Sequence, residues 1–121
     1  MIQTESILNI IDNSGVKSVK CIGIPKKKQA FLGDICTVSI QKLDLKKGKG
    51  SFKKGQVVPC LIVRTKFKFL RKDGNFILFQ ENAGILLTKD LNLVGSRAFG
   101  VTPYEIAKLH FKFATIFDAI I

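Results

Sequence analysis

The sequence predicts a mainly β protein in the form of one small closed barrel, and three observations lead to this prediction. The chain has 121 residues, 46% of them hydrophobic, which is enough for one buried core. Its apolar runs are short, and turn signals separate them about every 8–12 residues. Some runs alternate between apolar and polar residues, as half-buried strands do. This pattern is typical of a closed barrel rather than a parallel sheet, so we expect a single domain over residues 1–121.

Two runs near the N-terminus predict the first strands. The run at residues 6–12 ends in a turn signal, because Asp12 and Asn13 favour an Asx-type turn and Gly15 permits a positive φ. A second run, at residues 16–24, follows directly. We therefore expect two consecutive strands joined by a tight turn.

Two further strands are expected in the middle of the chain. Apolar and polar residues alternate along residues 35–41, so this strand should bury one face. The inward face would consist of Cys36, Val38 and Ile40. Residues 57–65 form the most apolar run, and Pro59 within it cannot donate a hydrogen bond to a neighbouring strand. Pro59 therefore marks a sheet edge or the start of its strand.

The next segment predicts a hairpin. Residues 72–75 read Lys-Asp-Gly-Asn, and an Asp-Gly pair suits the type I′ turn of a two-residue hairpin loop. Short apolar runs follow at residues 75–79 and 83–87, and we expect both to be strands.

The last fifth of the chain changes character, and we expect a short helical part at about residues 102–117. Thr102 and Glu105 have capping-box spacing, with proline at the first helical position. Apolar residues at helical spacing follow and should pack on the body over about two turns. They are Ile106, Leu109 and Phe113. Residues 111–117 either prolong the helix or form a final strand, and their alternating aromatic and β-branched residues favour the strand.

Positive charge is concentrated in one part of the sequence. The formal net charge is +11, and residues 41–72 alone contain eleven bases and one acid, Asp44. A local excess of this size predicts a polyanionic partner, either nucleic acid or an anionic membrane surface. The alternative is a solvated charged face, but such a face usually contains interspersed acids. We therefore favour nucleic acid, and we expect the surplus cations to lie on one side of the barrel.

Two segments supply most of these cations. Residues 45–56 form a loop rich in lysine and glycine, in which backbone N–H groups can approach an anion closely. The alternative is a solubilising hairpin tip. Along residues 64–72 bases and aromatics alternate, so the bases should share one face of an extended strand. Phe67 and Phe69, on the other face, either stack on bases or lie in the core, and we favour the core.

Two shorter segments add candidate phosphate contacts. Residues 25–29 form a second basic tip. The loop at residues 95–100 contains Arg97 between flanking glycines, which suits bidentate contact with a phosphate.

The sequence contains no recognisable catalytic or metal-binding arrangement. Cys21, Cys36 and Cys60 are far apart without a C-x-x-C motif, so we expect reduced, buried thiols rather than a disulfide or a metal site. A zinc site would need all three to converge on His110, the single histidine. We expect no enzymatic activity, no cofactor and no metal. We also expect no signal peptide and no transmembrane helix.

Five motifs occur in order: the opening Met-Ile-Gln, the Asp-Asn-Ser-Gly turn, an Ile-Val-Arg-Thr-Lys strand, an Asp-Gly stretch with a following Phe and Asn, and Gly-Ser-Arg-Ala-Phe-Gly. Together they resemble the universal large-subunit ribosomal protein fourteen family, from Met1 to about Phe117. The resemblance implies a five-stranded β-barrel with a projecting β-hairpin and a short helical C-terminal segment. It also implies a structural constituent of the large ribosomal subunit, without enzymatic activity.

The resemblance implies partners as well. They are large-subunit rRNA, small-subunit rRNA in an intersubunit bridge, neighbouring large-subunit ribosomal proteins and, in many lineages, a ribosome-silencing factor. From the charge pattern and the resemblance together, the candidate RNA-binding residues are Asn13, Ser14, Lys26, Lys27, Lys28, Lys46, Lys47, Lys49, Lys53, Lys54, Arg64, Lys66, Lys68, Arg71 and Lys72. Ser96 and Arg97 match the loop that the family offers to bridge RNA and to the silencing factor.

Some features depart from the family pattern or concern origin. Cys60 stands where a small residue is usual, and Phe113 stands where many members carry a base. The lysine-rich composition and the start at the family's own first residues predict an organelle-encoded protein of ribosomes in the mitochondrial matrix. A plastid or the bacterial cytoplasm is the alternative.

The competing function is a free barrel-type binder of single-stranded nucleic acid, which would need Phe67 and Phe69 exposed. A membrane-surface protein is a third reading, but it lacks a basic amphipathic helix.

Overall fold

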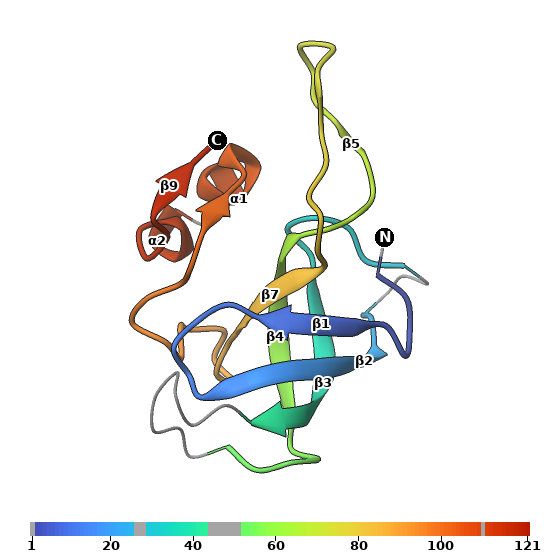
Figure 1. The fold of residues 1–121 in the computed structure, drawn as a ribbon, viewed down its shortest axis with the longest axis vertical. Helices are drawn as coiled ribbons and strands as arrows, with labels where there is room; N and C mark the ends of the chain where they lie inside the picture. Colours follow the sequence, from blue (N-terminus) through green and yellow to red (C-terminus); the bar gives the residue numbers. More distant parts are fainter. Residues whose placement is uncertain (1, 26–28, 44–51, 110) are drawn as a thin grey trace.

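In a computed structural model, which describes residues 2–25, 29–43, 52–109 and 111–121, the chain has three parts (Figure 1). A barrel forms the body, a hairpin projects from one end of it, and a helical segment lies near the C-terminus. The barrel strands are β1 (Ile7–Ile10), β2 (Val16–Gly23), β3 (Ile35–Leu43), β4 (Val57–Arg64) and β7 (Ala83–Leu86). The mainly β fold with a five-stranded barrel is therefore confirmed among the described residues.

Closure of the barrel depends on one short parallel pairing. Neighbouring strands are antiparallel in the order β1-β2-β3-β4-β7. Strand β1 then pairs with β7 in parallel, through Asn9 with Ala83 and Ile10 with Gly84. The turn between β1 and β2 is the predicted Asx-type turn, because the Ser14 amide donates to Asp12 Oδ1 at 3.2 Å.

Side chains from alternate strand positions fill the barrel interior. In β3 the predicted alternation is confirmed, with Cys36, Val38 and Ile40 buried and their neighbours partly exposed. The interior cluster also includes Leu8, Ile10, Val19, Cys21, Val58, Cys60, Ile62 and Leu86. A barrel of this size is filled by side chains and leaves no room for a channel.

A second apolar cluster lies outside the barrel wall. Every residue of β7 and the stretch 60–63 of β4 is buried, so both faces of these strands are covered. The outward cluster joins Leu61, Val63 and Ile85 to Ile106 and Phe113 of the C-terminal segment. Strands covered on both faces carry continuous apolar runs, which explains why residues 57–65 are the most apolar part of the sequence.

Pro59 is accommodated in β4 by its hydrogen-bonding position. The Ile40 amide donates to Gln56 O and the Ile62 amide donates to Asp34 O, each at 3.0 Å. Because antiparallel pairs alternate in type, the Thr37–Pro59 pair between these bonds is not hydrogen-bonded. Towards β7, the Pro59 carbonyl accepts from Leu87 at 3.0 Å, where that ladder ends. Pro59 thus lies near the start of its strand, as expected.

The projecting hairpin contains β5 (Phe69–Leu70) and β6 (Phe76–Ile77), and its turn differs from the prediction. A type I′ turn needs positive φ at both central residues, but only Gly74 has it, at 91°. The Gly74 amide donates to Arg71 O at 3.1 Å, and the Arg71 amide donates to Asn75 O at 2.8 Å. The loop therefore has three residues, with glycine in the left-handed position, and the Asp-Gly pair serves this longer turn.

The C-terminal segment consists of β8 (Val101–Thr102), α1 (Tyr104–Leu109), α2 (Phe111–Ala114) and β9 (Ala119–Ile120). Strand β8 precedes the helices in the sequence and β9 follows them, and the two strands pair in parallel. The preference for a strand over residues 111–117 was wrong for 111–114, because burial of Phe113 in the outer cluster accompanies a helical turn. Leu109 was expected to face the body, but it is exposed.

Gly84→Ala tests the tight contact between β4 and β7. A Cβ at Gly84 would lie 2.7 Å from both Cys60 Sγ and Leu61 O. We expect the substitution to lower the free energy of unfolding by about 1–3 kcal/mol, measured by urea denaturation. Gly23→Ala is the matched control, since no atom lies within 4 Å of its added Cβ. Equal effects of the two substitutions would contradict this packing.

Candidate nucleic-acid interface

Among the described residues, the basic side chains that flank β4 in the sequence lie at its two ends. Lys53 and Lys54 precede β4, whereas Lys66, Lys68 and Lys72 follow it on the hairpin (Figure 1). The eight residues of β4 span roughly 26 Å at the usual rise of a strand. The described basic segments that flank β4 are therefore separated along the barrel by the length of this strand. The expectation that the surplus cations share one side of the barrel includes Lys46, Lys47 and Lys49, which lie outside the described residues, and it stays a prediction.

At the first end, the residues before β4 form a turn that exposes both described lysines. The Lys53 amide donates to Gln56 Oε1 at 3.2 Å, and the Gly55 amide donates to Ile40 O at 2.8 Å. Lys53 and Lys54 are exposed beside this turn. The other lysines predicted for the two basic tips lie outside the described residues; they are Lys26, Lys27, Lys28, Lys46, Lys47 and Lys49.

At the second end, the chain bends after β4 instead of continuing as a strand. Thr65 Oγ1 donates to Phe67 O at 3.2 Å, and the Lys66 amide donates to Asn82 Oδ1 at 2.9 Å. Lys66 and Lys68 are exposed, but the regular alternation expected across residues 64–72 is interrupted by this bend.

The two phenylalanines of this segment have different environments. Phe69 packs against the outer apolar cluster, which confirms the core interpretation for that residue. Phe67 is 50% exposed, so the same interpretation was wrong for it. Lys68 Nζ lies 4.7 Å from the ring centroid of Phe76, another exposed aromatic side chain. Aromatic and cationic groups therefore alternate on the surface of the hairpin.

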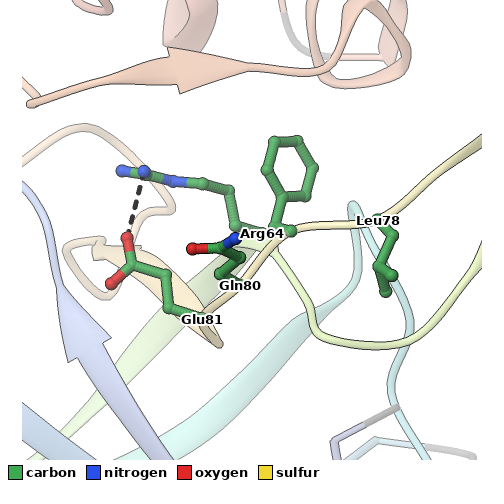
Figure 2. A pocket seen from close by; sticks show the side chains of 5 residues that line it. Arg64, Leu78, Gln80 and Glu81 are labelled. Atoms are coloured by element: carbon green, nitrogen blue, oxygen red, sulfur yellow. Dashed lines mark ion pairs between the residues drawn. The ribbon is translucent and has the colours of Figure 1, made fainter.

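Arg64 is engaged within the protein (Figure 2). Its Nη1 lies 3.0 Å from Glu81 Oε1, and its Nη2 donates to Phe99 O at 2.7 Å. Its Nε is buried without a hydrogen-bond partner among the described residues. Burial lowers the pKa of the guanidinium, and the Glu81 carboxylate opposes that shift. Arg64 thus connects the end of β4 to the loop that precedes β8, beside an open pocket lined by Leu78, Phe79, Gln80 and Glu81.

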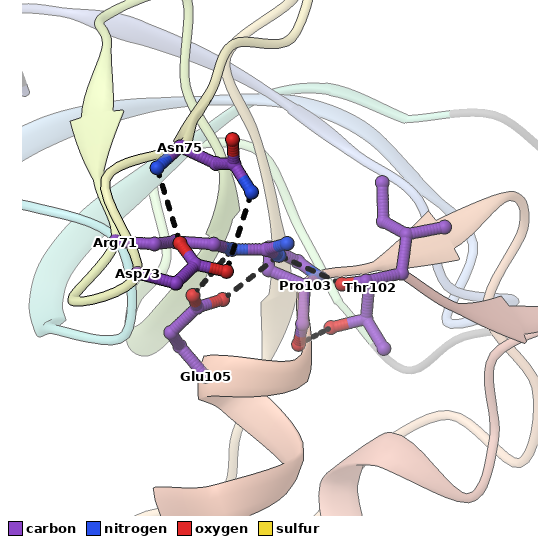
Figure 3. Close-up of polar contacts among 7 residues, drawn as sticks. Arg71, Asp73, Asn75, Thr102, Pro103 and Glu105 are labelled. Carbon is purple, nitrogen blue, oxygen red and sulfur yellow. Dashed lines mark hydrogen bonds and ion pairs between the residues drawn. The ribbon is translucent and has the colours of Figure 1, made fainter.

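Arg71 joins the hairpin to the C-terminal segment (Figure 3). Its Nε and Nη2 donate to the two carboxylate oxygens of Glu105, at 2.7 and 3.3 Å. Nη2 also donates to Ile121 O at 2.7 Å, and the guanidinium stacks on Tyr104, 4.6 Å from the ring centroid. The Glu105 carboxylate therefore faces Arg71 and not the Thr102 amide, so the expected capping box is replaced by this bidentate pair.

The turn after β1 and the loop at residues 95–97 lie together. The Asn13 side chain donates to Ser96 Oγ at 2.9 Å, and Asn13 Oδ1 accepts from the Ser96 and Arg97 amides at 2.9 and 3.3 Å. The Arg97 side chain is 67% exposed and lies 3.5 Å from Asp118 Oδ1. Two candidate sites that are 83 residues apart in the sequence therefore form one surface region.

Ser14 belongs to the same turn but is buried. Its hydroxyl donates to Asp12 Oδ1 at 2.5 Å, and Asp12 Oδ2 accepts from the Leu86 amide at 3.2 Å. The Asp12 carboxylate therefore connects the turn to β7, and the buried Ser14 hydroxyl is engaged with that carboxylate.

The acidic partners of Arg64 and Arg71 were missed from the sequence. Glu81 is 17 residues after Arg64, and Glu105 is 34 residues after Arg71. Neither pair has helical or cross-strand spacing that could be recognised without the fold. The net charge of the stretch 41–72 therefore overstates the charge available to a partner.

The three cysteines are buried, as expected, and they are free thiols in the barrel interior. Cys36 and Cys60 are directly opposite in β3 and β4. Burial raises the pKa of Cys21 to about 11, and a hydrogen bond with Cys36 raises the pKa of Cys60.

Among the described residues, no cluster of His, Cys, Asp and Glu side chains is arranged to hold a metal ion. Within the same residues, no helix has the length and apolar character that a membrane crossing needs.

Arg71→Met tests the role of the hairpin junction. Its ion pair with Glu105 is only 17% and 16% exposed, so the substitution leaves a mostly buried carboxylate without its main partner. We expect the free energy of unfolding to fall by about 1–3 kcal/mol. Arg97→Met removes an exposed pair and should change it by no more than about 0.5 kcal/mol. Similar losses for both variants, by urea denaturation, would show that Arg71 is not a special anchor.

Thiol labelling tests the burial of the cysteines. At pH 8 the thiol of Cys21 stays protonated because its pKa is about 11, and only the thiolate is reactive. A chromogenic disulfide reagent should therefore modify the folded protein far more slowly than the protein in urea, in which all three thiols should react. Rapid labelling of any of the three in the folded protein would contradict the buried arrangement.

Comparison with known proteins gives two findings. Residues 1–120 match the family model described as ribosomal protein L14p/L23e. The chain is also 40% identical over 111 residues to the large ribosomal subunit protein uL14c of Helicosporidium sp. subsp. Simulium jonesii. That alignment covers 89% of this chain and 88% of the relative.

Proposed function

Because the chain belongs to the ribosomal protein L14p/L23e family, we propose that it binds large-subunit rRNA with the lysines at both ends of β4. Membership makes the chain a structural constituent of the ribosome, in the large subunit, and not an enzyme. The observation that carries the proposal is a difference in ion pairing among the described residues. The arginines pair with acids of the protein, whereas the exposed lysines at the ends of β4 do not. RNA phosphates would supply the negative charge that the protein itself does not provide.

The described lysines at the barrel ends make no ion pair with any acid in the part of the chain that the structure describes. Lys53, Lys54, Lys66, Lys68 and Lys72 are exposed, and none makes an ion pair with another described residue. A solvated ammonium on a flexible stem can follow a phosphate backbone as a point charge. We include Lys26, Lys27, Lys28, Lys46, Lys47 and Lys49 in the proposed interface on their sequence position alone.

Arg64 and Arg71 take a supporting part in this proposal. Their guanidinium groups are held by Glu81 and Glu105, so little of their charge is free for phosphate. They instead fix the hairpin, which carries Lys66 and Lys68, relative to the barrel and the C-terminal segment. Direct RNA contact by either arginine would add to this role.

The region around Asn13 and Arg97 is the proposed surface for an intersubunit bridge. Asn13 fixes the backbone of Ser96 and Arg97, and this leaves the Arg97 side chain exposed to small-subunit rRNA or a silencing factor. Phe113, where many family members carry a base, is buried and offers no contact of its own. A silencing factor would therefore depend on Ser96 and Arg97 here.

The organelle of origin also stays a proposal. The relative reported above carries the suffix used for chloroplast proteins, which fits the plastid alternative and leaves the mitochondrial assignment unconfirmed.

Sedimentation of lysate through a sucrose gradient tests the assignment to the subunit. We expect the protein to migrate with intact large subunits and to remain there in high salt. Recovery only in free fractions would instead favour an unassembled binder of single-stranded nucleic acid. The exposed rings of Phe67 and Phe76 are the observation that favours that second candidate.

Lysine substitution tests the proposed RNA contacts. Changing Lys66 and Lys68 together to Gln should weaken binding to an rRNA fragment and reduce the slope of log affinity against log salt by about 1–2. Changing Lys89 and Lys112 to Gln removes equal charge outside the proposed interface and should leave the slope unchanged. Filter binding at several salt concentrations measures both. Equal slopes for the two variants would contradict contact by the hairpin lysines.

The loop lysines require a separate variant. Changing Lys46, Lys47, Lys49, Lys53 and Lys54 to Gln should lower RNA affinity and flatten the salt dependence while the thermal unfolding transition is retained. An unchanged salt slope would show that this loop only solubilises the protein.

A further inference from the structure

A groove lies between residues 69–72 of the hairpin and helix α1, and Lys72 belongs both to its lining and to the exposed lysines of the hairpin described above. Its volume is about 290 Å³, and its floor includes Leu32 and Phe69, which belong to or pack on the outer apolar cluster. Its rims are Leu70 on the hairpin and Leu109 on the helix, which are 74% and 65% exposed. Tyr104 at the start of α1 completes the apolar lining. Contiguous apolar side chains around a hollow usually mark an interaction site.

The charges around the groove have a definite sign. Arg71 and Glu105 both line it, but their bidentate pair cancels the charge of each. Lys72 on the hairpin and Lys108 on the helix also line it, are exposed, and make no ion pair with another described residue. The groove therefore has an apolar floor and a positively charged rim.

The lining suits a protein segment better than RNA. RNA bases stack on free aromatic faces, but the guanidinium of Arg71 already lies over one face of the Tyr104 ring, 4.6 Å from its centroid. Leu70 and Leu109 have no π face, and their exposed aliphatic surfaces would gain most from contact with apolar side chains. A partner with carboxylates beside an apolar anchor would satisfy both the floor and the rim.

We propose that this groove binds an acidic segment of a neighbouring protein in the large subunit, with a leucine or phenylalanine of that segment on the groove floor. Carboxylates flanking this anchor would pair with Lys108 and Lys72. The inference rests on the proposed function, since it places the chain in the subunit. The Arg71–Glu105 pair defines the groove geometry, because it holds the hairpin wall and the helix wall together.

Photocrosslinking in assembled subunits tests the class of partner. A photoreactive amino acid in place of Leu109, on the full chain incorporated into large subunits, should form crosslinks to protein, and mass spectrometry should locate them in an acidic segment. Crosslinks to rRNA, to a second copy of this chain or to a segment without acids would overturn the inference. If the chain fails to enter large subunits even before substitution, the proposed function itself fails, and sedimentation detects that separately.

A binding assay on the isolated full chain tests the chemistry. The probe is a short synthetic peptide in which glutamates surround a Leu-Phe pair. It is compared with a peptide in which lysines replace the glutamates, and with a peptide in which two serines replace the Leu-Phe pair. We expect binding of the first alone, weakened about tenfold by Leu109→Ser or by Lys108→Glu. The matched control is Ile7→Ser, which removes an exposed aliphatic side chain from β1, outside the groove. This variant should bind the first peptide as the wild type does.

Two results of this assay would overturn the inference. One is equal binding of all three peptides, and the other is the absence of any effect of Leu109→Ser and Lys108→Glu. Unfolding transitions matching the wild type would establish that the substitutions at these exposed positions leave the fold intact.

Discussion

The structure depends on the burial of two barrel strands from both sides. An ordinary small barrel buries only its inward-facing side chains, and its outer wall is solvated. Here the outer faces of β4 and β7 are covered by the C-terminal segment, with Ile106 and Phe113 packed on Leu61, Val63 and Ile85. This contact fixes the helices to the barrel wall and leaves the ends of β4 as the places where the chain can extend outward. The basic turn and the hairpin both extend from these ends.

The choice of cation follows from this arrangement. All three arginines of the chain make ion pairs with acids, and the side chains of Arg64 and Arg71 are largely buried at junctions between the parts of the fold. A planar guanidinium can donate to a carboxylate and a carbonyl together, as Arg71 does with Glu105 and Ile121. Within the described ranges, the exposed lysines at the barrel ends make no such pairs. Arg64 and Arg71 therefore make internal connections, whereas the proposed contacts with partners use exposed lysines and Arg97.

Much of the fold could be predicted from the sequence because it depends on local patterns. The alternation that buries Cys36, Val38 and Ile40, and the Asx turn at Asp12, are both readable over a few residues. The positions of Leu109 and Phe113 were harder, because only the outer wall of β4 and β7 decides which face of each short helix is covered.

The candidate site was less predictable, because its charges are cancelled by residues far away in the sequence. Counting bases in residues 41–72 located the most basic segment of the chain but could not separate Arg64 and Arg71, which have acidic partners, from the exposed lysines. It also could not show that β4 divides the segment between two ends. Those facts require the tertiary partners Glu81 and Glu105 and the direction of one strand.

Lysine acylation of intact large subunits, compared with the free chain, tests the central claim most directly. Lys53, Lys54, Lys66 and Lys68 should react readily in the free chain and be protected in the subunit, whereas Lys89 and Lys112 should be less affected. Protection at both ends of β4 would support the two-ended RNA interface. Full reactivity of these four lysines within assembled subunits would contradict it.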